Sequence, residues 1–132
     1  MTILIVEDDK AQANLLSKLL KHEGHLIKVA YAPLPAFEMI RRGDIDIVLM
    51  DLGLPGLDGV SFVRKLKKYE DIANIPIIAL TGQPREFGEV DALRAGFVAY
   101  LEKPVNTKVL LDLLKTHGPA TAPIERPSKK KK

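Results

Sequence analysis

Short apolar segments alternate along the chain with stretches in which apolar side chains recur every three or four residues. The segment 26–30 alternates apolar and polar residues, which is typical of an edge strand, whereas the continuous runs indicate strands covered on both faces. Helical spacing between the segments predicts amphipathic helices. The pattern therefore predicts five strands separated by helices, with the strands at 2–6, 26–30, 45–50, 75–80 and 97–101.

The helices have recognisable ends. Asp9 is placed to cap the first helix and Gly24 to end it. Its buried face is expected to carry four leucines, Leu15, Leu16, Leu19 and Leu20. The helix predicted over 84–95 contains Gly88, and an interior glycine costs about 1 kcal/mol relative to alanine, so we expect it to be short. The remaining helices are expected around Phe37 and Ile40 (closed by Gly43), around Val60, Val63 and Leu66, and around Val105, Val109, Leu110, Leu113 and Leu114.

This strict alternation predicts an α/β domain with a parallel sheet, because right-handed crossovers place helices on both faces. In such open sheets ligands bind outside the carboxyl ends of the strands. Functional residues are therefore expected where the strands end.

Composition narrows the class of protein. The 132 residues are 46% hydrophobic and 28% charged, enough for one domain with a core but short for two. Cysteine is absent, which excludes a disulfide framework, a thiol nucleophile and a cysteine-ligated metal. No apolar run approaches the ~20 residues of a membrane span, and no signal-peptide pattern is present. A cytoplasmic protein is the expectation.

The net charge of +3 belongs to the end of the chain. Residues 119–132 carry five basic groups and one acid, which leaves 15 basic and 16 acidic residues in 1–118. A nearly neutral body does not suggest direct DNA binding. Residues 118–132 hold three prolines and the run Lys129–Lys132, which predicts a disordered Pro/Lys-rich tail after a domain at 1–117. Weak electrostatic contact of the lysines with nucleic acid, a membrane surface or an acidic partner stays an alternative.

Polar side chains follow four of the five predicted strands. Glu7, Asp8 and Asp9 follow the first, Asp51 the third, Thr81 the fourth and Lys103 the fifth. Two like charges 4 Å apart repel by roughly 4 kcal/mol at an effective dielectric constant of 20. Crowded carboxylates therefore require cations, and Lys103 with a hard divalent ion, Mg²⁺ or Mn²⁺, would supply them.

Four motifs on these elements resemble the receiver domain of two-component response regulators. They are ILIVEDD at 3–9, VLMDLGLPGLDG at 48–59, IIALTG at 77–82 and AYLEKP at 99–104. The resemblance covers residues 2 to about 116. It implies a flavodoxin-like doubly wound (βα)5 fold with strand order 2-1-3-4-5, and a phosphoacceptor signalling domain rather than a conventional enzyme.

The resemblance also implies roles for individual residues. Asp51 would accept a phosphoryl group, Thr81 and Lys103 would contact that group, and Tyr100 would be the aromatic switch. Asp8 and Asp51 would ligate Mg²⁺, with Glu7 acting through water and Gly53 through its backbone carbonyl. Pro104 would follow a cis peptide. Gly53 and Gly82 depart from common family residues, and Gly53 and Gln83 flank the phosphoryl site, where they would affect phosphate lifetime.

The implied partners are a sensor histidine kinase or a histidine phosphotransfer protein, and an effector bound through the fourth helix, fifth strand and fifth helix. The domain would be a monomer or a phosphorylation-dependent dimer. Three alternatives stay open: a Mg²⁺-dependent phosphohydrolase, a phosphorylation-independent scaffold, and a receiver fragment of a hybrid kinase or larger response regulator. Against the first, Gly53 stands where such phosphohydrolases place a second aspartate. The sequence identifies neither the cognate kinase nor the pathway.

Overall fold

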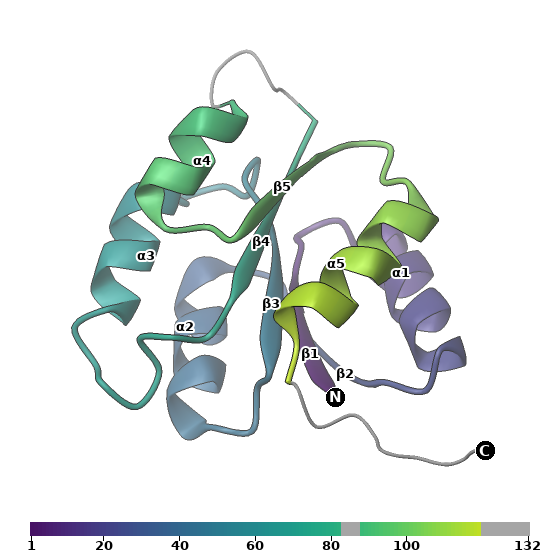
Figure 1. Cartoon of the computed structure of the whole chain (residues 1–132), viewed down its shortest axis with the longest axis horizontal. Coiled ribbons are helices and arrows are strands. Elements are labelled where there is room, and N and C mark those ends of the chain that lie inside the picture. Colours follow the sequence, from purple (N-terminus) through teal and green to yellow (C-terminus); the bar gives the residue numbers. More distant parts are fainter. Residues whose placement is uncertain (83–87, 120–132) are drawn as a thin grey trace.

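The strands lie in one parallel sheet in the computed structural model, which describes residues 1–82 and 88–119. The sheet order is β2-β1-β3-β4-β5, as the flavodoxin-like pattern predicts. The first strand in sequence is therefore an interior strand, and β2 is the edge strand that its alternating pattern indicated (Figure 1). The strands are β1 (Thr2–Val6), β2 (Leu26–Ala30), β3 (Ile47–Asp51), β4 (Ile77–Thr81) and β5 (Ala99–Glu102).

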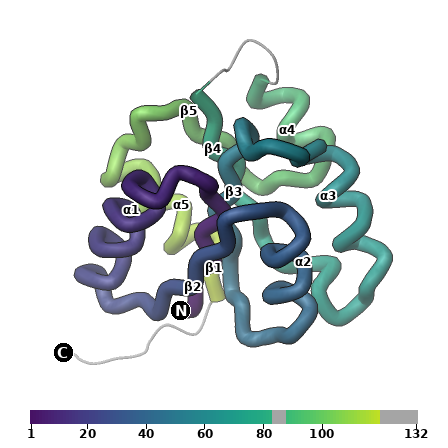
Figure 2. The backbone as a smooth tube through the Cα atoms, turned by 180° about the vertical axis from the view of Figure 1, so that it is seen from behind, coloured from purple at the N-terminus to yellow at the C-terminus, as the bar shows by residue number. Residues whose placement is uncertain are grey.

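Helices cover both faces of the sheet. The helices are α1 (Lys10–His22), α2 (Pro33–Arg42), α3 (Gly59–Leu66), α4 (Glu89–Ala95) and α5 (Thr107–His117). Helices α1 and α5 lie on one face, and α2, α3 and α4 lie on the other (Figures 1 and 2). This arrangement follows from right-handed crossovers between parallel strands, and it confirms the predicted fold class.

The alternation of side chains along each strand divides the core in two. In β1, Leu4 and Val6 pack into the cluster with α2, α3 and α4, whereas Ile3 and Ile5 pack with Leu20 of α1 and with α5. Successive side chains of a strand point to opposite faces, so every central strand must be apolar on both sides. This requirement explains the continuous apolar runs of β1, β3 and β4.

The structure shifts three strands relative to the sequence prediction. Strand β3 includes Asp51, which pairs with Leu80 of β4, so the carboxylate belongs to the strand itself. Strand β4 begins at Ile77 rather than at residue 75. Pro76 has no N–H to donate, although its carbonyl accepts from the Val48 N–H at 3.0 Å. The strand ends at Thr81, one residue later than predicted, and β5 likewise ends one residue later, at Glu102.

The buried face of α1 differs from the prediction. Ala13, Ser17 and Leu20 are buried, whereas Leu15 is 73% exposed. These positions keep the helical spacing, but the face is rotated toward small residues that let the helix approach the sheet. Asp9 caps the helix as predicted, accepting from the Gln12 N–H at 3.1 Å.

Helix α4 begins later than the predicted 84–95 segment. Gly88 is its N-cap rather than an interior residue, so the propensity penalty does not apply. Residues 84–87 lie outside the described residues. The helix ends at Gly96, whose φ of +113° is left-handed and suits the residue without a side chain that ends many helices.

Helices α2 and α5 also have defined starts. Pro33 is the first residue of α2. Proline is tolerated at this position because the N–H that it lacks would have no partner within the helix. Gly43 closes the helix as predicted. Asn106 caps α5, so Val105 precedes the helix. No helix in the described part of the chain is long and apolar enough to cross a membrane.

Candidate functional site

Three carboxylates converge at the carboxyl edge of the sheet. Glu7 and Asp8 directly follow β1, and Asp51 ends the neighbouring β3, with Val6 paired to Met50 in register. One oxygen from each of the three lies within 4.8 Å of the others. Glu7 and Asp51 are only 5% and 6% exposed, whereas Asp8 is exposed. The predicted cluster is therefore present.

Lys103 supplies the positive charge of this cluster. Its Nζ lies 2.9 Å from Glu7 Oε1 and 3.1 Å from Asp51 Oδ2. The Lys103 N–H donates to the Thr81 carbonyl at 2.7 Å, and the bond to Pro104 is cis. The fifth strand and its loop thus bring the ammonium to two acids of β1 and β3.

Burial and charge act in opposite directions on these groups. Burial raises the pKa of Glu7 more than the hydrogen bond from Lys103 lowers it, and the nearby Asp51 raises it further. Burial lowers the pKa of Lys103, but hydrogen bonds and charges from Glu7 and Asp51 outweigh it, so the pKa is raised overall. Lys103 is therefore firmly protonated, and the folded site disfavours an ionised Glu7.

Gly53 and Gly82 lie beside the two strand ends. The Gly53 N–H donates to Asp51 Oδ1 at 2.9 Å, and a Cβ at Gly53 would lie 3.4 Å from that oxygen. A Cβ at Gly82 would meet nothing within 4 Å. A side chain at position 53 would therefore contact the Asp51 carboxylate, whereas a Cβ at position 82 would not. Gln83, the other expected flanking residue, lies outside the described residues.

Thr81 and Tyr100 belong to the opposite face of the sheet from Lys103. Thr81 follows Ile77 and Ala79 in the alternation that faces α2, α3 and α4, and Tyr100 packs against the same cluster. Thr81 is 4% exposed. Both side chains thus lie on the α4 side of the sheet, Thr81 at the end of β4 and Tyr100 on β5.

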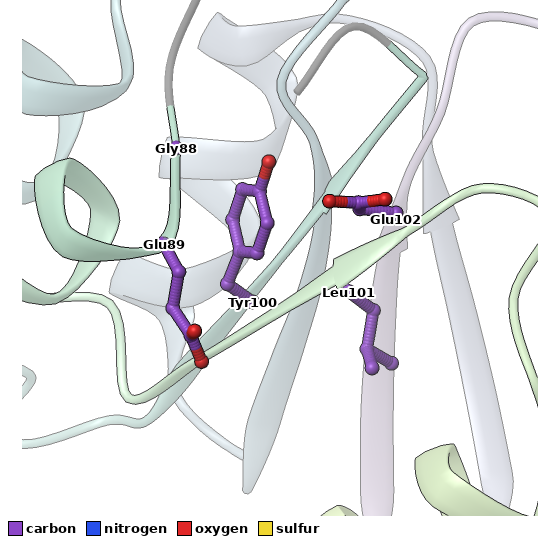
Figure 3. Close-up of a pocket in the computed structure, with 5 residues that line it drawn as sticks. All are labelled: Gly88, Glu89, Tyr100, Leu101 and Glu102. Carbon is purple, nitrogen blue, oxygen red and sulfur yellow. The ribbon is translucent and has the colours of Figure 1, made fainter. Parts of the chain in front are cut away.

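Tyr100 lines a pocket of about 330 Å³ with Gly88, Glu89, Leu101 and Glu102 (Figure 3). Its hydroxyl is buried and has no hydrogen-bond partner within the described residues. Burial, followed by the charges of Glu102 and Glu89, raises the pKa of Tyr100. Because a buried tyrosine hydroxyl usually finds a partner, Tyr100 is an exception among the described residues.

The carboxylates fit a hard divalent cation. Mg²⁺ prefers oxygen ligands and commonly uses one or two carboxylates with water and phosphate. Glu7 accepts from Lys103 through Oε1 and from the Asp9 N–H through Oε2 at 3.1 Å, which leaves it suited to contact through water. Asp8 accepts no hydrogen bond within the described residues, so its oxygens are free for direct ligation.

Gln12 also belongs to the site, although no sequence motif predicts it there. Its side-chain oxygen accepts from Lys103 Nζ at 2.9 Å. Gln12 is exposed in the first turn of α1, three residues after the helix cap. That spacing could indicate a residue near the carboxyl edge of the sheet, but not one whose side chain reaches Lys103.

A groove extends from the site along α1. Its volume is about 430 Å³, and one end is polar, with Glu7, Gln12 and Lys103. The rest is mainly apolar, lined by Leu15, Leu16, Leu19, Leu80, Pro104, Val105 and Thr107. Three of the four leucines predicted on the buried face of α1, Leu15, Leu16 and Leu19, thus line a groove that reaches Lys103.

Comparison with known proteins identifies the class. The family model of the response regulator receiver domain matches residues 3–115, and the chain belongs to this family of signalling domains.

Solved receiver domains share the fold. The chain is similar to the receiver domain of sensor histidine kinase PA1611 from Pseudomonas aeruginosa, with magnesium in its active site cleft, at 32% identity and a TM-score of 0.77, covering 88% of this chain and 95% of that one. It is also similar to the signal receiver domain of a DNA-binding response regulator from Colwellia psychrerythraea, at 32% identity and a TM-score of 0.77, covering 88% of this chain and 96% of that one.

The chain is also similar to a chain in the co-crystal structure of the Saccharomyces cerevisiae phosphotransfer protein Ypd1 with the receiver domain of its response regulator Ssk1. The identity is 26% and the TM-score 0.79, over 89% of this chain and 88% of that one.

Proposed function

We propose that the chain accepts a phosphoryl group from a phosphohistidine onto Asp51, with Mg²⁺, and that this changes the surface it offers to an effector. The observation that carries the proposal is the position of Asp51. It is a buried carboxylate at the end of a central strand, 3.1 Å from Lys103 and within 4.8 Å of two other acids. A rigid nucleophile with charge compensation nearby is what phosphoryl transfer requires.

The transfer needs no further protein nucleophile. An Asp51 carboxylate oxygen forms the new P–O bond, the P–N bond to the donor imidazole breaks, and the leaving nitrogen keeps the electron pair. The product is an acyl phosphate. Lys103 stabilises the charge on the phosphoryl oxygens, and the Thr81 hydroxyl is proposed to donate a hydrogen bond to one of them. The same groups would assist the later hydrolysis of the acyl phosphate.

Asp8 and Asp51 would bind Mg²⁺ directly, Glu7 through water and Gly53 through its carbonyl. Bound there, Mg²⁺ or Mn²⁺ would neutralise the acidic cluster and the incoming phosphoryl oxygens. The magnesium-bound receiver of PA1611 supports this assignment by similarity.

The groove along α1 is the proposed docking surface for the phosphodonor. A histidine kinase or a histidine phosphotransfer protein must bring its phosphoryl group to Asp51, and the groove is the apolar surface that ends at this site. Leu15 is 73% exposed there, and together with the other apolar residues of the groove it forms a contiguous surface of the kind that partner proteins cover. The structure of Ypd1 with the Ssk1 receiver shows that a similar domain binds such a partner.

The effector is proposed to bind the face formed by α4, β5 and α5. Thr81 would move toward the phosphoryl group, and Tyr100 would fill the space left behind, where its hydroxyl could gain a hydrogen bond. Phosphorylation would thereby shift an existing equilibrium between two positions of Tyr100. Val90, Leu93 and Val109 are 62%, 48% and 42% exposed on α4 and α5, which offers apolar contacts to such an effector.

Intact-mass spectrometry tests the proposal. Wild type, Asp51→Asn and the control Asp71→Asn are incubated with acetyl phosphate, with Mg²⁺ or with EDTA. Asp71 is exposed and lies outside the site. One phosphoryl adduct is expected in wild type and in Asp71→Asn, only with Mg²⁺, and none in Asp51→Asn.

A negative result has a defined sequel. If wild type gives no adduct with acetyl phosphate, it is incubated with phosphorylated histidine phosphotransfer proteins. Failure there too would contradict the proposal and favour a phosphorylation-independent scaffold. An adduct that persists in Asp51→Asn would move the phosphoacceptor elsewhere.

A further inference from the structure

Both polar atoms of the Gln12 side-chain amide are hydrogen-bonded. Its backbone N–H donates to Asp9 Oδ1 at 3.1 Å, and its Nε2 donates to Asp9 Oδ2 at 3.2 Å. Its Oε1 accepts from Lys103 at 2.9 Å. Because the amide nitrogen is fixed by the helix cap, the amide oxygen must face away from Asp9 and toward Lys103. Gln12 therefore links the start of α1 to the ammonium in the site.

Gln12 completes the coordination of Lys103. An ammonium has three donors, and Lys103 Nζ meets three acceptors: Glu7 at 2.9 Å, Gln12 at 2.9 Å and Asp51 at 3.1 Å. Two of these acceptors are carboxylates at the ends of strands β1 and β3. The third is a neutral amide on a helix, so it orients the ammonium without adding negative charge beside an incoming phosphoryl group.

We propose that Gln12 is a positioning residue for phosphoryl transfer, an inference that rests on the proposed function. By holding one ammonium proton, Gln12 keeps the flexible Lys103 side chain directed at Asp51 before the donor arrives. When the phosphoryl group joins Asp51, one of its oxygens takes the place of Asp51 Oδ2 on Lys103, and the bonds to Glu7 and Gln12 persist. A charge already in place need not reorganise during the reaction.

A docked donor protein would cover Gln12. Gln12 lines the groove proposed to receive the donor, and it is exposed in the free domain. A docked partner would exclude water from the Gln12–Lys103 hydrogen bond and strengthen it. The contribution of Gln12 should therefore be larger with a protein donor than with acetyl phosphate.

The first measurement is NMR of the Lys103 ammonium without any phosphate donor. A hydrogen-bonded ammonium exchanges slowly with water and gives an observable resonance. We expect Gln12→Ala to accelerate this exchange at least severalfold, and Gln12→Glu, which keeps an oxygen acceptor, to restore slow exchange. The matched control is Asn14→Ala, an exposed residue of the same helix outside this network, which should leave the exchange rate unchanged.

The second measurement is the rate of phosphorylation at saturating Mg²⁺. Loss of one exposed hydrogen bond to a charged group corresponds to about a three- to tenfold change in rate. Gln12→Ala should lower the maximal rate with acetyl phosphate by that factor at an unchanged half-saturating donor concentration. Asp9→Ser keeps a cap but removes the second oxygen that holds Gln12, so it should show a smaller effect in the same direction.

The outcomes separate this inference from the proposed function. Unchanged Lys103 exchange in Gln12→Ala overturns the positioning role. Faster exchange with an unchanged rate of phosphorylation overturns the role in transfer. If wild type accepts no phosphoryl group from any donor, the proposed function fails and the role in transfer fails with it, while the exchange rates still report whether Gln12 holds Lys103.

Discussion

Replacing Asp8 by asparagine should stabilise the domain when divalent cations are absent. Asp8 is the acid of the cluster that has no hydrogen bond to Lys103 in the described structure, yet its carboxylate lies within 4.8 Å of those of Glu7 and Asp51. The change removes one negative charge and keeps the size of the side chain. Asp51→Asn relieves repulsion as well, but it also removes the 3.1 Å pair with Lys103, so Asp8 gives the cleaner test.

The separation sets the magnitude. Two unit charges 4.8 Å apart repel by about 3.5 kcal/mol at a dielectric constant of 20 and about 0.9 kcal/mol in bulk water. Asp8 is exposed, so its repulsion lies toward the water value, and Lys103 offsets part of it. We expect a net stabilisation of about 1 kcal/mol, or about 3–6 °C in Tm for a domain of this size.

Urea and thermal unfolding in EDTA and in Mg²⁺ provide the assay. In EDTA the Asp8→Asn variant should be more stable than wild type. Mg²⁺ binding to the folded state at ten times its dissociation constant adds about 1.4 kcal/mol, and wild type should gain this while the variant gains little. The order of the two proteins should therefore reverse in Mg²⁺, whereas Asp71→Asn should follow wild type in both conditions.

Two results would refute this reasoning. If Asp8→Asn were less stable than wild type in EDTA, the carboxylates would not repel one another at the observed separation. If both proteins gained equally from Mg²⁺, Asp8 would not be a ligand.

Three further predictions concern stability, protonation and docking. Gly96→Ala should destabilise the domain by about 2 kcal/mol or more in urea unfolding, because it combines a left-handed φ with a Cβ only 2.8 Å from Val63. Gly24→Ala, with φ +94° and open space, should cost only the backbone part, about 1–2 kcal/mol, and equal losses would contradict the steric argument. Burial and the N-terminal charge lower the pKa of His25 below 6.5, so the unfolded chain binds the proton first and stability falls as pH decreases below about 6.5. His25→Gln should flatten this dependence, and an NMR titration midpoint at or above 6.5 would contradict it. Leu15→Ser should leave unfolding and acetyl phosphate reactivity unchanged but slow transfer from a phosphorylated histidine phosphotransfer protein by about tenfold, the loss expected for one apolar anchor of an interface, and an unchanged transfer rate would remove the groove as the docking surface.

The sequence alone determined the architecture and most of the site. Continuous apolar runs bounded by turn residues favour strands that are covered on both faces, and helical periodicity between them favours parallel pairing. Parallel strands end at one edge of the sheet, so the positions of Glu7, Asp8, Asp51 and Lys103 after their strands predict that the four side chains lie close together. Glycines and prolines between these elements predicted where several of the helices end or begin.

The tertiary structure decided which surface each helix buries. Leucines at positions 15, 16, 19 and 20 gave an apolar stripe, but the contact with the sheet favours the small residues Ala13 and Ser17. Close approach of a helix to a sheet depends on the shape of both surfaces, which a one-dimensional pattern does not contain. The displaced leucines became the groove beside the site.

Tertiary structure also decided which side chains of the site contact one another. Gln12 and Lys103 are 91 residues apart in the chain, and nothing local to either residue indicates the other. The division between Lys103 on one face and Thr81 with Tyr100 on the other depends on where each strand ends, and a shift of one residue reverses it. Sequence therefore determined which groups gather at the edge of the sheet, whereas packing and strand register determined which of them touch.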